Sequence, residues 1–438
     1  MNKHFKRLSL CLILCMLLCA LVPIGAQAEM PEFIDYVSHL EFNRASETVK
    51  AEATVKTFVD GDTVHFDVDE QICETGVLKA RFLAVNTPES TGKIEEYGKM
   101  AAAFTRKQLE SAESIWVESD NSSWNLDTTS ERHLVWVWYR LPGETAYRNL
   151  NLEILQNGLA VANSTKQNRY GTICMDALNQ ARAYKLNLYS GQRDPDFYYG
   201  DAVELTIKEL RTNLEAYNGI KVAFNGIVTV NASNAVYVES FDDETGMYYG
   251  MSVYYGFGLP GAGLDILSVG NEVRIVGTVQ YYEAGDTWQV SGLTYRPMKP
   301  KDPNNIQKLS SGHSPAYVPT NADVFFSQVT LTTEDSTRVF DYADLALATS
   351  IEMQNLTVTD VYTTTDEDSS SHGALTLTCV SDGHTVYVRT IPLYGADGEL
   401  LTADMFIGRT IDVRGIVDYH DGLHQVKVFT QNNIFFND

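Results

Sequence analysis

Three segments carry charged residues near the ends of expected strands, where their side chains could meet and perform chemistry. Asp60-Gly61-Asp62-Thr63 is expected to form a tight turn after a strand that ends at Val59, because Asp and Gly are residues that turns require. Arg81 and Glu89 lie some twenty residues further on, and Arg132 enters a later apolar strand. By itself, the acidic turn is most simply a hairpin without chemistry.

Arg81 is harder to explain as a surface residue. Strand alternation places it on the same face as Leu83 and Val85. A guanidinium on an apolar face requires an anionic partner. That partner is either Glu89, in a structural ion pair, or a phosphate.

The combination of these groups indicates a specific chemistry. Two arginines and one glutamate at strand ends, beside an acidic turn, meet the needs of phosphodiester hydrolysis. A hydroxide must be generated, and a doubly charged, phosphorane-like transition state must be neutralised. A hard cation can assist both steps.

At this point the sequence resembles the staphylococcal (micrococcal) nuclease, or thermonuclease, family. The resemblance runs from about residue 56 to residue 190. It rests on six ordered segments: Val59 to Thr63, Arg81 to Glu89, Tyr97 to Thr105, Arg132 to Leu134, Leu152 to Ala160 and Ala181 to Ser190.

The resemblance implies a five-stranded OB barrel with three helices, in a family that cleaves DNA and RNA with calcium. By position, Glu89 resembles the general base that activates water. Arg81 and Arg132 resemble the pair that grips the phosphate and stabilises the transition state through bidentate donors.

The resemblance also implies a calcium site made of mixed oxygen ligands. Asp62, Asn86 and the backbone carbonyl of Thr87 fall where the family holds the ion. The family usually has Asp at the position of Asn86, so the amide should give weaker calcium binding.

Two further departures concern how the nucleotide is held. The stretch 128–134 lacks the Lys and Tyr that cover the nucleotide phosphate in the family. Tyrosines expected after Ala160 are replaced by Asn163, Ser164 and Thr165, and Tyr170 is a candidate substitute for one of them. Base stacking and end-group recognition in the first domain are therefore in doubt.

The surrounding pattern predicts the elements that position these residues. Period-two alternation predicts strands at 64–68, 77–85 and 133–139, and helices are expected at 97–109, 149–156 and 175–189. Strands followed by helices indicate an α+β barrel, expected over 46–195.

The remainder of the chain contains a repeat. The segments 270–281 and 408–419 match in pattern, each with a central glycine, a following glycine turn and a Gln-Val pair. A strand bent at a glycine is typical of small closed barrels. The fold class predicted is therefore an α+β OB-barrel nuclease domain followed by two all-β OB-like domains, at 202–296 and 320–438, with a linker at 297–319.

The first 28 residues have the layout of a secretory signal peptide: basic residues, an apolar run from Leu8 to Val22, and Ala26-Gln27-Ala28. A membrane anchor and a lipoprotein signal at Cys19 are the alternatives. We expect a secreted or surface-associated monomer without a membrane span in the mature chain. Three cysteines, Cys73, Cys174 and Cys379, remain after removal of the first 28 residues. Either Cys73 and Cys174 form a disulfide bridge, or all three are separate thiols.

Composition limits the partners. The chain has 33 Lys and Arg against 57 Asp and Glu, a net charge of -24, so long-range attraction of nucleic acid is disfavoured. DNA or RNA would have to be held by a few placed cations or by Ca²⁺. Nothing in the sequence identifies what the two tail domains bind.

Other candidates have simpler structural explanations. His133 is best read as a strand histidine at the barrel rim, and the acidic clusters 242–244 and 366–368 as solvated loops. The aromatic segments 248–249 and 254–257 could stack bases, but strand packing explains them more simply.

Three hypotheses follow from the sequence: a secreted, calcium-dependent nuclease, a binding module that has lost its chemistry, and a surface adhesion protein with a vestigial barrel. The persistence of both arginines and the glutamate favours the nuclease.

Overall fold

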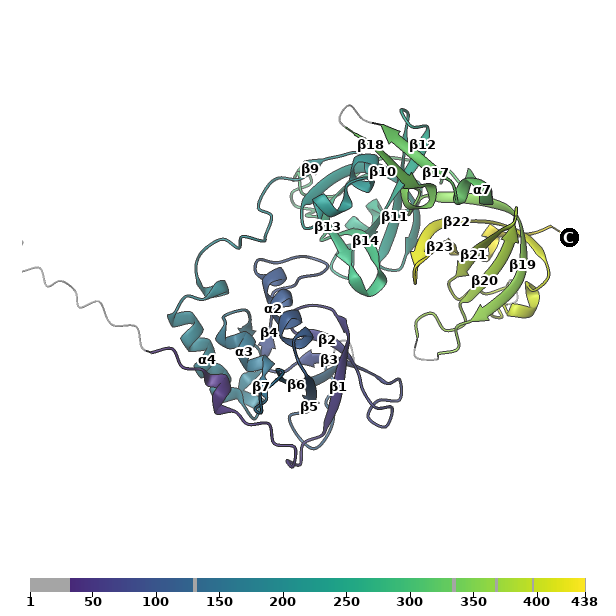
Figure 1. The fold of residues 1–438 in the computed structure, drawn as a ribbon. Coiled ribbons are helices and arrows are strands. Elements are labelled where there is room, and N and C mark those ends of the chain that lie inside the picture. Colours follow the sequence, from purple (N-terminus) through teal and green to yellow (C-terminus); the bar gives the residue numbers. More distant parts are fainter. Residues whose placement is uncertain (1–31, 129–131, 333–335, 367–368, 396–397, 438) are drawn as a thin grey trace, which may run out of the picture.

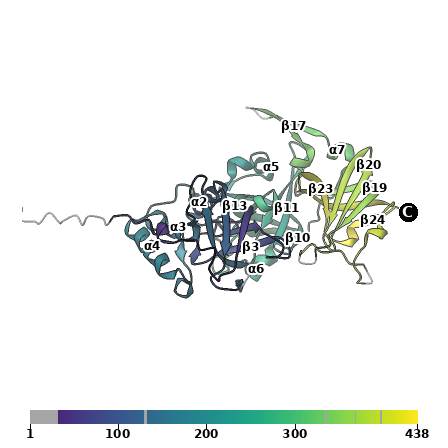
Figure 2. The same cartoon turned by 60° about the horizontal axis from the view of Figure 1, so that its bottom comes forward.

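The computed structural model describes residues 32–128, 132–332, 336–366, 369–395 and 398–437. Three small β-barrels follow one another along the chain (Figure 1). The third barrel, which carries the C-terminus, lies at the opposite end of the molecule from helix α4 (Gly171–Ala183) of the first (Figure 2). The expected signal peptide lies outside the described residues.

The first barrel closes in the strand order β1-β2-β3-β6-β5-β1. All pairs are antiparallel except β3 and β6, which run parallel with Arg81 opposite Leu134. This parallel pair brings the two segments that carry Arg81 and Arg132 side by side. The strands are β1 (Lys50–Phe58), β2 (Thr63–Asp67), β3 (Val77–Phe82), β5 (Ser114–Glu118) and β6 (His133–Arg140).

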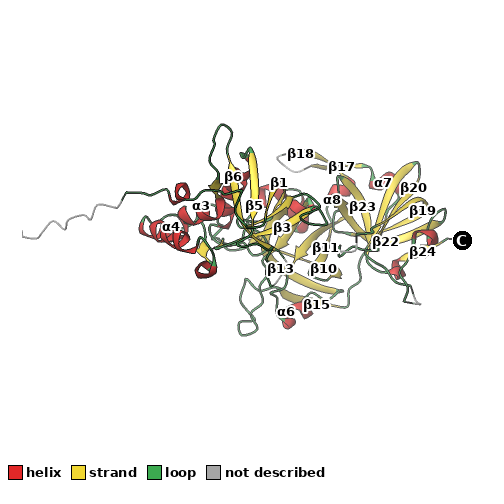
Figure 3. Ribbon diagram, turned by 90° about the horizontal axis from the view of Figure 1, so that it is seen from below, coloured by secondary structure: helices red, strands yellow, loops and turns green. Residues whose placement is uncertain are grey.

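Helices pack against this barrel and share its core, with α3 (Leu150–Gln156) and α4 together on one side of the strands (Figure 3). They are α2 (Gly98–Glu110), α3 (Leu150–Gln156) and α4, with the short helices η1 (Tyr36–His39), η2 (Thr165–Gln167) and η3 (Asn187–Tyr189). The third helix was expected at 175–189, but α4 begins at Gly171 and ends at Ala183, earlier at both ends. Lys185 adopts a positive φ of 54° and ends it, and the chain continues into η3.

The second and third barrels repeat the same strand order, with the third and fifth strands parallel in each. The predicted OB-like fold class is therefore confirmed. The second contains β10 (Lys221–Ala232), β11 (Ala235–Asp242), β12 (Met247–Tyr254), β13 (Asn271–Tyr282) and β14 (Thr287–Ser291); the third contains β19 (Ser350–Thr363), β20 (Leu375–Ser381), β21 (His384–Thr390), β22 (Thr410–His420) and β23 (Leu423–Val428).

The repeated central glycines occupy equivalent places in the two tail barrels. A Cβ on Gly277 of β13 would come within 2.6 Å of the Ser291 carbonyl oxygen, and one on Gly415 of β22 within 2.6 Å of the Lys427 carbonyl oxygen. Each barrel therefore closes through a backbone approach that only glycine allows.

Short elements complete the structure. Those around the first barrel are β4 (Val85–Asn86), β7 (Arg148–Asn149) and β8 (Val161–Ala162); around the second, β9 (Val203–Glu204), α5 (Ile207–Arg211), η4 (Leu214–Tyr217), α6 (Gly261–Ile266) and η5 (Glu283–Gly285); around the third, β16 (Val318–Pro319), α7 (Ala322–Phe325), α8 (Tyr342–Leu345), η6 (Ala403–Met405), η7 (Gln431–Asn433) and β24 (Ile434–Phe436).

Two segments differ from the expected division of the tail. Residues 297–319, expected as a linker, contain β15 (Gln307–Ser311), which pairs with β13 and so extends the second barrel. The hairpin of β17 (Gln328–Thr332) and β18 (Thr337–Asp341) lies within the predicted third domain but packs against the second core. Tertiary contacts decide these assignments, because a local pattern can predict a strand but not the barrel against which that strand packs.

A buried carboxylate joins the second and third barrels. Glu239 on β11 accepts backbone N–H groups from Ala316 at 2.8 Å and Ser350 at 2.7 Å, and the Ser350 hydroxyl at 2.9 Å. Burial raises the pKa of Glu239. These contacts fix the third barrel to the second.

Cys73, Cys174 and Cys379 are all free thiols, so the Cys73–Cys174 bridge is not formed. Burial raises the pKa of Cys174 and of Cys379 to about 12. Within the described part of the chain, no helix has both the length and the apolar character needed to cross a bilayer.

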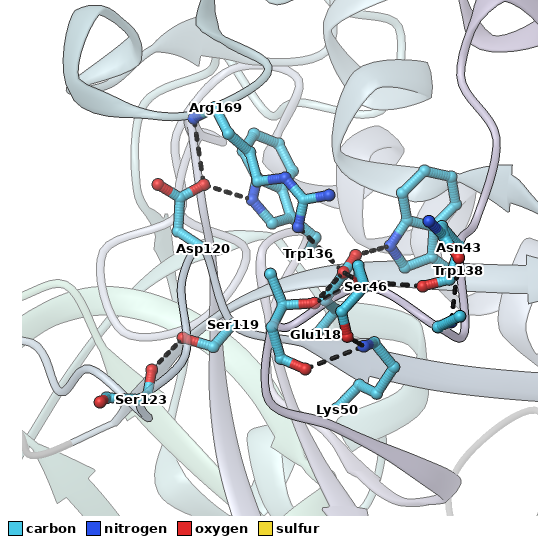
Figure 4. A network of polar contacts seen from close by, with 12 residues as sticks. Asn43, Ser46, Lys50, Glu118, Ser119, Asp120, Ser123, Trp136, Trp138 and Arg169 are labelled. Carbon is cyan, nitrogen blue, oxygen red and sulfur yellow. Dashed lines mark hydrogen bonds and ion pairs between the residues drawn. The ribbon is translucent and has the colours of Figure 1, made fainter.

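A buried polar network stabilises one side of the first barrel (Figure 4). Glu118, only 1% exposed, accepts hydrogen bonds from the indole of Trp138 at 2.8 Å and from the guanidinium of Arg169 at 2.9 Å. Thr48 also donates to this carboxylate, at 2.5 Å. One carboxylate thus joins the segment before β1, strand β6 and the loop before α4.

Replacing Glu118 by alanine should destabilise the first barrel by about 3 kcal/mol, because it leaves buried donors and a partly buried guanidinium without their acceptor. The measurement is urea unfolding followed by tryptophan fluorescence, which reports this barrel because Trp288 alone of the five tryptophans lies elsewhere. Asp67→Ala, which removes the exposed partner of Lys56, is the matched control and should cost less than about 1 kcal/mol. Equal losses in both variants would contradict a structural role for the network.

Candidate active site

The acidic turn between β1 and β2 is built by hydrogen bonds within its own residues. The Asp62 backbone N–H donates to Asp60 Oδ1 at 3.0 Å, and the N–H groups of Val59 and Asp60 both donate to the Thr63 carbonyl. Helix α2 holds the turn in place, because the Thr105 hydroxyl donates to the Gly61 carbonyl at 2.6 Å. The turn is therefore a fixed platform for both carboxylates.

Gly61 is required by the packing of this turn. A Cβ at that position would lie 2.9 Å from the Cβ of Ala101 and 2.9 Å from the side chain of Thr87. Any larger residue would push the turn away from α2 and from the segment that follows β3.

The segment after Arg81 turns toward this platform. The strand expected at 77–85 is interrupted, because Ala84 adopts a φ of +67° between β3 and β4. The Thr87 backbone N–H then donates to Asp62 Oδ2 at 2.8 Å. A local left-handed residue thus brings Asn86 and Thr87 beside the acidic turn.

The anionic partner of Arg81 is Asp62. The ion pair with Glu89, one of the two alternatives that the sequence left open, is not formed. Arg81 Nη1 forms an ion pair with Asp62 Oδ1, and Nη2 donates to Asn86 Oδ1 at 2.6 Å. Asp62 is fully buried. Burial lowers the pKa of Arg81, opposed by the nearby carboxylates of Asp60 and Glu89.

Arg132 lies on the same side of the barrel. Its guanidinium contacts Asp127 Oδ2 through Nη2 at 2.6 Å and through Nε at 2.8 Å. Its Nη1 is 3.4 Å from the Thr63 hydroxyl, at the end of the acidic turn. The parallel pairing of β3 with β6 therefore places both guanidiniums beside one turn.

Glu89 is exposed, and it follows the segment that the Thr87–Asp62 hydrogen bond holds against the acidic turn. Partial burial raises the pKa of Glu89, and the carboxylates of Asp60 and Glu95 raise it further against the opposing effect of Arg81. The loop after it is compact, because the Glu95 N–H donates to the Glu89 carbonyl at 2.9 Å. A raised pKa makes this carboxylate a stronger base than an ordinary glutamate, which suits a group that accepts a proton.

Sequence reasoning missed Asp60 as a member of this site. It is 9% exposed, and burial raises its pKa while Arg81 and Arg132 oppose that shift. The available signal was the two-residue spacing of Asp60 and Asp62, which places two carboxylates in one short turn.

The oxygen atoms gathered here fit a hard cation. Asp62 and Asn86 direct side-chain oxygens at the Arg81 guanidinium, so a positive charge already occupies the point between them. The buried hydroxyl of Thr87 has no partner among the described residues. No cluster of three His, Cys, Asp or Glu suited to a metal occurs in the described ranges, so an ion here would need amide and carbonyl oxygens as well.

Other sequence candidates have structural roles. The ring of Tyr170 packs against Trp136 with centroids 5.0 Å apart, and burial raises its pKa to about 12, so it is a packing residue. His133 packs edge-on against Trp124. Asp242 binds Lys208 at 3.0 Å and caps its own turn. Residues 129–131 and 367–368 lie outside the described part of the chain.

Comparison with known families agrees with this geometry. Residues 79–191 match the family model described as Staphylococcal nuclease homologue, so the chain contains a domain of this family. The matched range includes Arg81, Glu89 and Arg132, whereas the acidic turn precedes it and joins the site through the fold. No curated protein matches the chain.

Proposed function

We propose that the first barrel is a calcium-dependent nuclease that hydrolyses phosphodiester bonds of DNA, with RNA as a second substrate. One observation carries this proposal: the parallel pairing of β3 with β6 places Arg81 and Arg132 beside one buried acidic turn, where Arg81 pairs with Asp62 and Arg132 contacts Thr63. The hydrogen bond from Thr87 to Asp62 brings the segment that carries Glu89 to the same turn. The nuclease family of the domain supports the same reaction class.

In the proposed mechanism Glu89 accepts a proton from the attacking water. Arg81 and Arg132 donate hydrogen bonds to the non-bridging oxygens as negative charge develops on the phosphate. Asp62, Asn86 and the Thr87 carbonyl would hold calcium, which supplies Lewis-acid stabilisation of the same charge. Asp127 positions Arg132 by binding both Nε and Nη2.

Arg81 has to serve two partners in this mechanism. It binds Asp62 and Asn86, which carry oxygens proposed as calcium ligands. A cation at those oxygens would repel the guanidinium and leave its donors for the phosphate. Metal binding and phosphate binding are thus expected to strengthen one another.

The proposed setting is extracellular. The layout of residues 1–28 supports export of the nuclease, and the tail barrels would then position the first barrel on its substrate or at the surface. We propose that the exported chain is a monomer.

The direct test is cleavage by the purified chain that follows residue 28. Single-stranded DNA, duplex DNA and RNA are each incubated with calcium and then with a calcium chelator. We expect cleavage that requires calcium and is absent from a Glu89→Gln preparation made in the same way. DNA that is bound but never cut would support the binding-module hypothesis, and absence of binding would support the adhesion hypothesis.

Replacing Asn86 by aspartate should strengthen calcium binding. A carboxylate adds a full negative charge to the ligand set, so the calcium concentration for half-maximal cleavage should fall roughly tenfold. The measurement is a calcium titration of initial rates, with Asn163→Asp as a control that adds the same charge outside the proposed ligand set. An unchanged titration would show that Asn86 does not contact the ion.

A further inference from the structure

The second barrel is attached to the loop that follows Glu89. Gln280 of β13 donates to the Gly92 carbonyl at 2.9 Å and accepts the Gly92 N–H at 3.0 Å. The Ser291 hydroxyl of β14 donates to the same carbonyl at 2.7 Å. Arg106 of α2 forms an ion pair with Glu283 nearby. The second barrel is therefore fixed beside the proposed active site.

A large cleft lies between the two barrels at this attachment. It has a volume of about 1190 Å³, and Glu89 and Lys93 line it from the first barrel. The second barrel contributes residues 254–260 and 292–296. A smaller cavity of about 140 Å³ shares Thr91 and Tyr282 with it and reaches Asp60. We call the larger space the interbarrel cleft; Glu89 lines it, and Asp60 lines the smaller cavity beside it.

Aromatic side chains line the second-barrel side of the interbarrel cleft. The Phe257 side chain is 91% exposed, although burial is favourable for a hydrophobic ring. Tyr282 is 41% exposed. Tyr255 is different, because its hydroxyl is bound to Asn231 and Ser233. Strand packing thus accounts for Tyr255, as the sequence suggested, but it does not account for Phe257.

The cleft also reverses the charge balance of the chain. A neighbouring cavity of about 260 Å³ shares Lys93 and Arg296 with it and adds Lys99 and Lys221. Asp196 and Glu89 are the acidic residues that line the two cavities. Arg296 is paired with Asp302 at 2.9 Å, which leaves the three lysines as the main source of positive charge.

We propose that the interbarrel cleft binds a single-stranded nucleic acid that extends from the proposed phosphate site. Its bases would stack on Phe257 and Tyr282, because exposed aromatic faces bind unpaired bases of any sequence. Its phosphates would pair with Lys93 in the cleft and with Lys99 and Lys221 in the neighbouring cavity. A duplex keeps its bases stacked inside, so it could not use the aromatic faces. This inference rests on the proposed function for its orientation.

The test separates binding in the cleft from cleavage in the first barrel. Phe257→Ala and Lys93→Gln are combined in the otherwise complete chain, and both residues are exposed. Phe241→Ala, which removes an exposed aromatic ring on β11, and Lys308→Gln on β15 are combined as the matched control. The substrates are a dinucleotide and twelve-nucleotide single strands of DNA and of RNA, with a duplex of the same length.

We expect KM for the single strands to rise about tenfold in the cleft variant, with kcat unchanged and the dinucleotide cut normally. The control variant should resemble the wild type on every substrate. Equal KM values for the cleft and control variants would overturn the inference and leave the nuclease proposal intact. If KM rises for only one of the two single strands, DNA or RNA, the cleft is assigned to that nucleic acid.

A second readout does not require cutting. Fluorescence anisotropy of labelled twelve-nucleotide strands measures binding directly, with calcium present and in the chelator. Weaker binding by the cleft variant would support the inference even if the chain proved inactive as a nuclease. Tighter binding of duplex than of single strand would contradict it.

Discussion

The substitution Glu89→Gln is expected to lower kcat/KM for phosphodiester cleavage about 10³-fold, because it removes the proposed proton acceptor while keeping the size of the side chain. Glu89 is exposed, so the fold should tolerate the change. The measurement is initial cleavage rate at saturating calcium, with melting curves to show that the variant is folded.

The pH dependence of cleavage provides the diagnostic for this role. The raised pKa of Glu89, caused by burial, Asp60 and Glu95, means that the base stays protonated to a higher pH than an ordinary glutamate. Activity should therefore fall with decreasing pH through that raised pKa. Glu95→Gln removes one of the carboxylates that raise it, so the acidic limb should move to lower pH.

The outcome that would contradict the assignment is equally clear. If Glu89→Gln keeps the rate of the wild type, or if its acidic limb is unchanged, another group accepts the proton. Asp60 would then be the first residue to examine, since its pKa is also raised by burial and it borders the same guanidiniums.

The substitution Arg81→Ala is expected to lower kcat about 10³-fold or more, because charged donors to a developing anion contribute mainly in the transition state. The variant should also be less stable without calcium. Asp62 is fully buried and would lose its cationic partner. Calcium at the same oxygens should restore stability, so the melting temperature of Arg81→Ala should respond to calcium more than that of the wild type.

Arg81→Lys and Arg132→Ala complete this experiment. Lysine keeps the charge but loses the planar fork, so the single-point donor should recover stability more than activity. Arg132→Ala should lose activity without the calcium-dependent change in stability, because its partner is Asp127 and not a proposed metal ligand. Full activity in either alanine variant would remove that arginine from the mechanism.

The local pattern of the sequence was sufficient for most of the first barrel. Alternation and turn residues predicted the strand that carries Arg81, the strand that follows Arg132, and the helices α2 and α3 within one residue of their ends. The repeated central glycines likewise predicted two related barrels, because a closed small barrel needs a close backbone approach that each glycine supplies.

The partners of the charged residues could not be read in the same way. Strand alternation indicated that Arg81 needs an anion, but the choice among Asp62, Glu89 and a phosphate depends on distances across the barrel. The positive φ at Ala84, which brings Thr87 to Asp62, has no glycine to mark it. The sequence did not identify Asp60 as a site residue for a related reason. Asp is common in turns, and the burial that distinguishes Asp60 is a property of the folded chain.

The sequence by itself determined the residue types, their order and the strands that carry them, since turn chemistry and hydrophobic period are local properties. Tertiary structure alone decided which charges meet, because β3 and β6 pair across a long separation in the chain. It also decided that the second barrel borders the proposed active site. The contacts of Gly92 with Gln280 and Ser291 join residues about two hundred positions apart, and no local pattern encodes such a pairing.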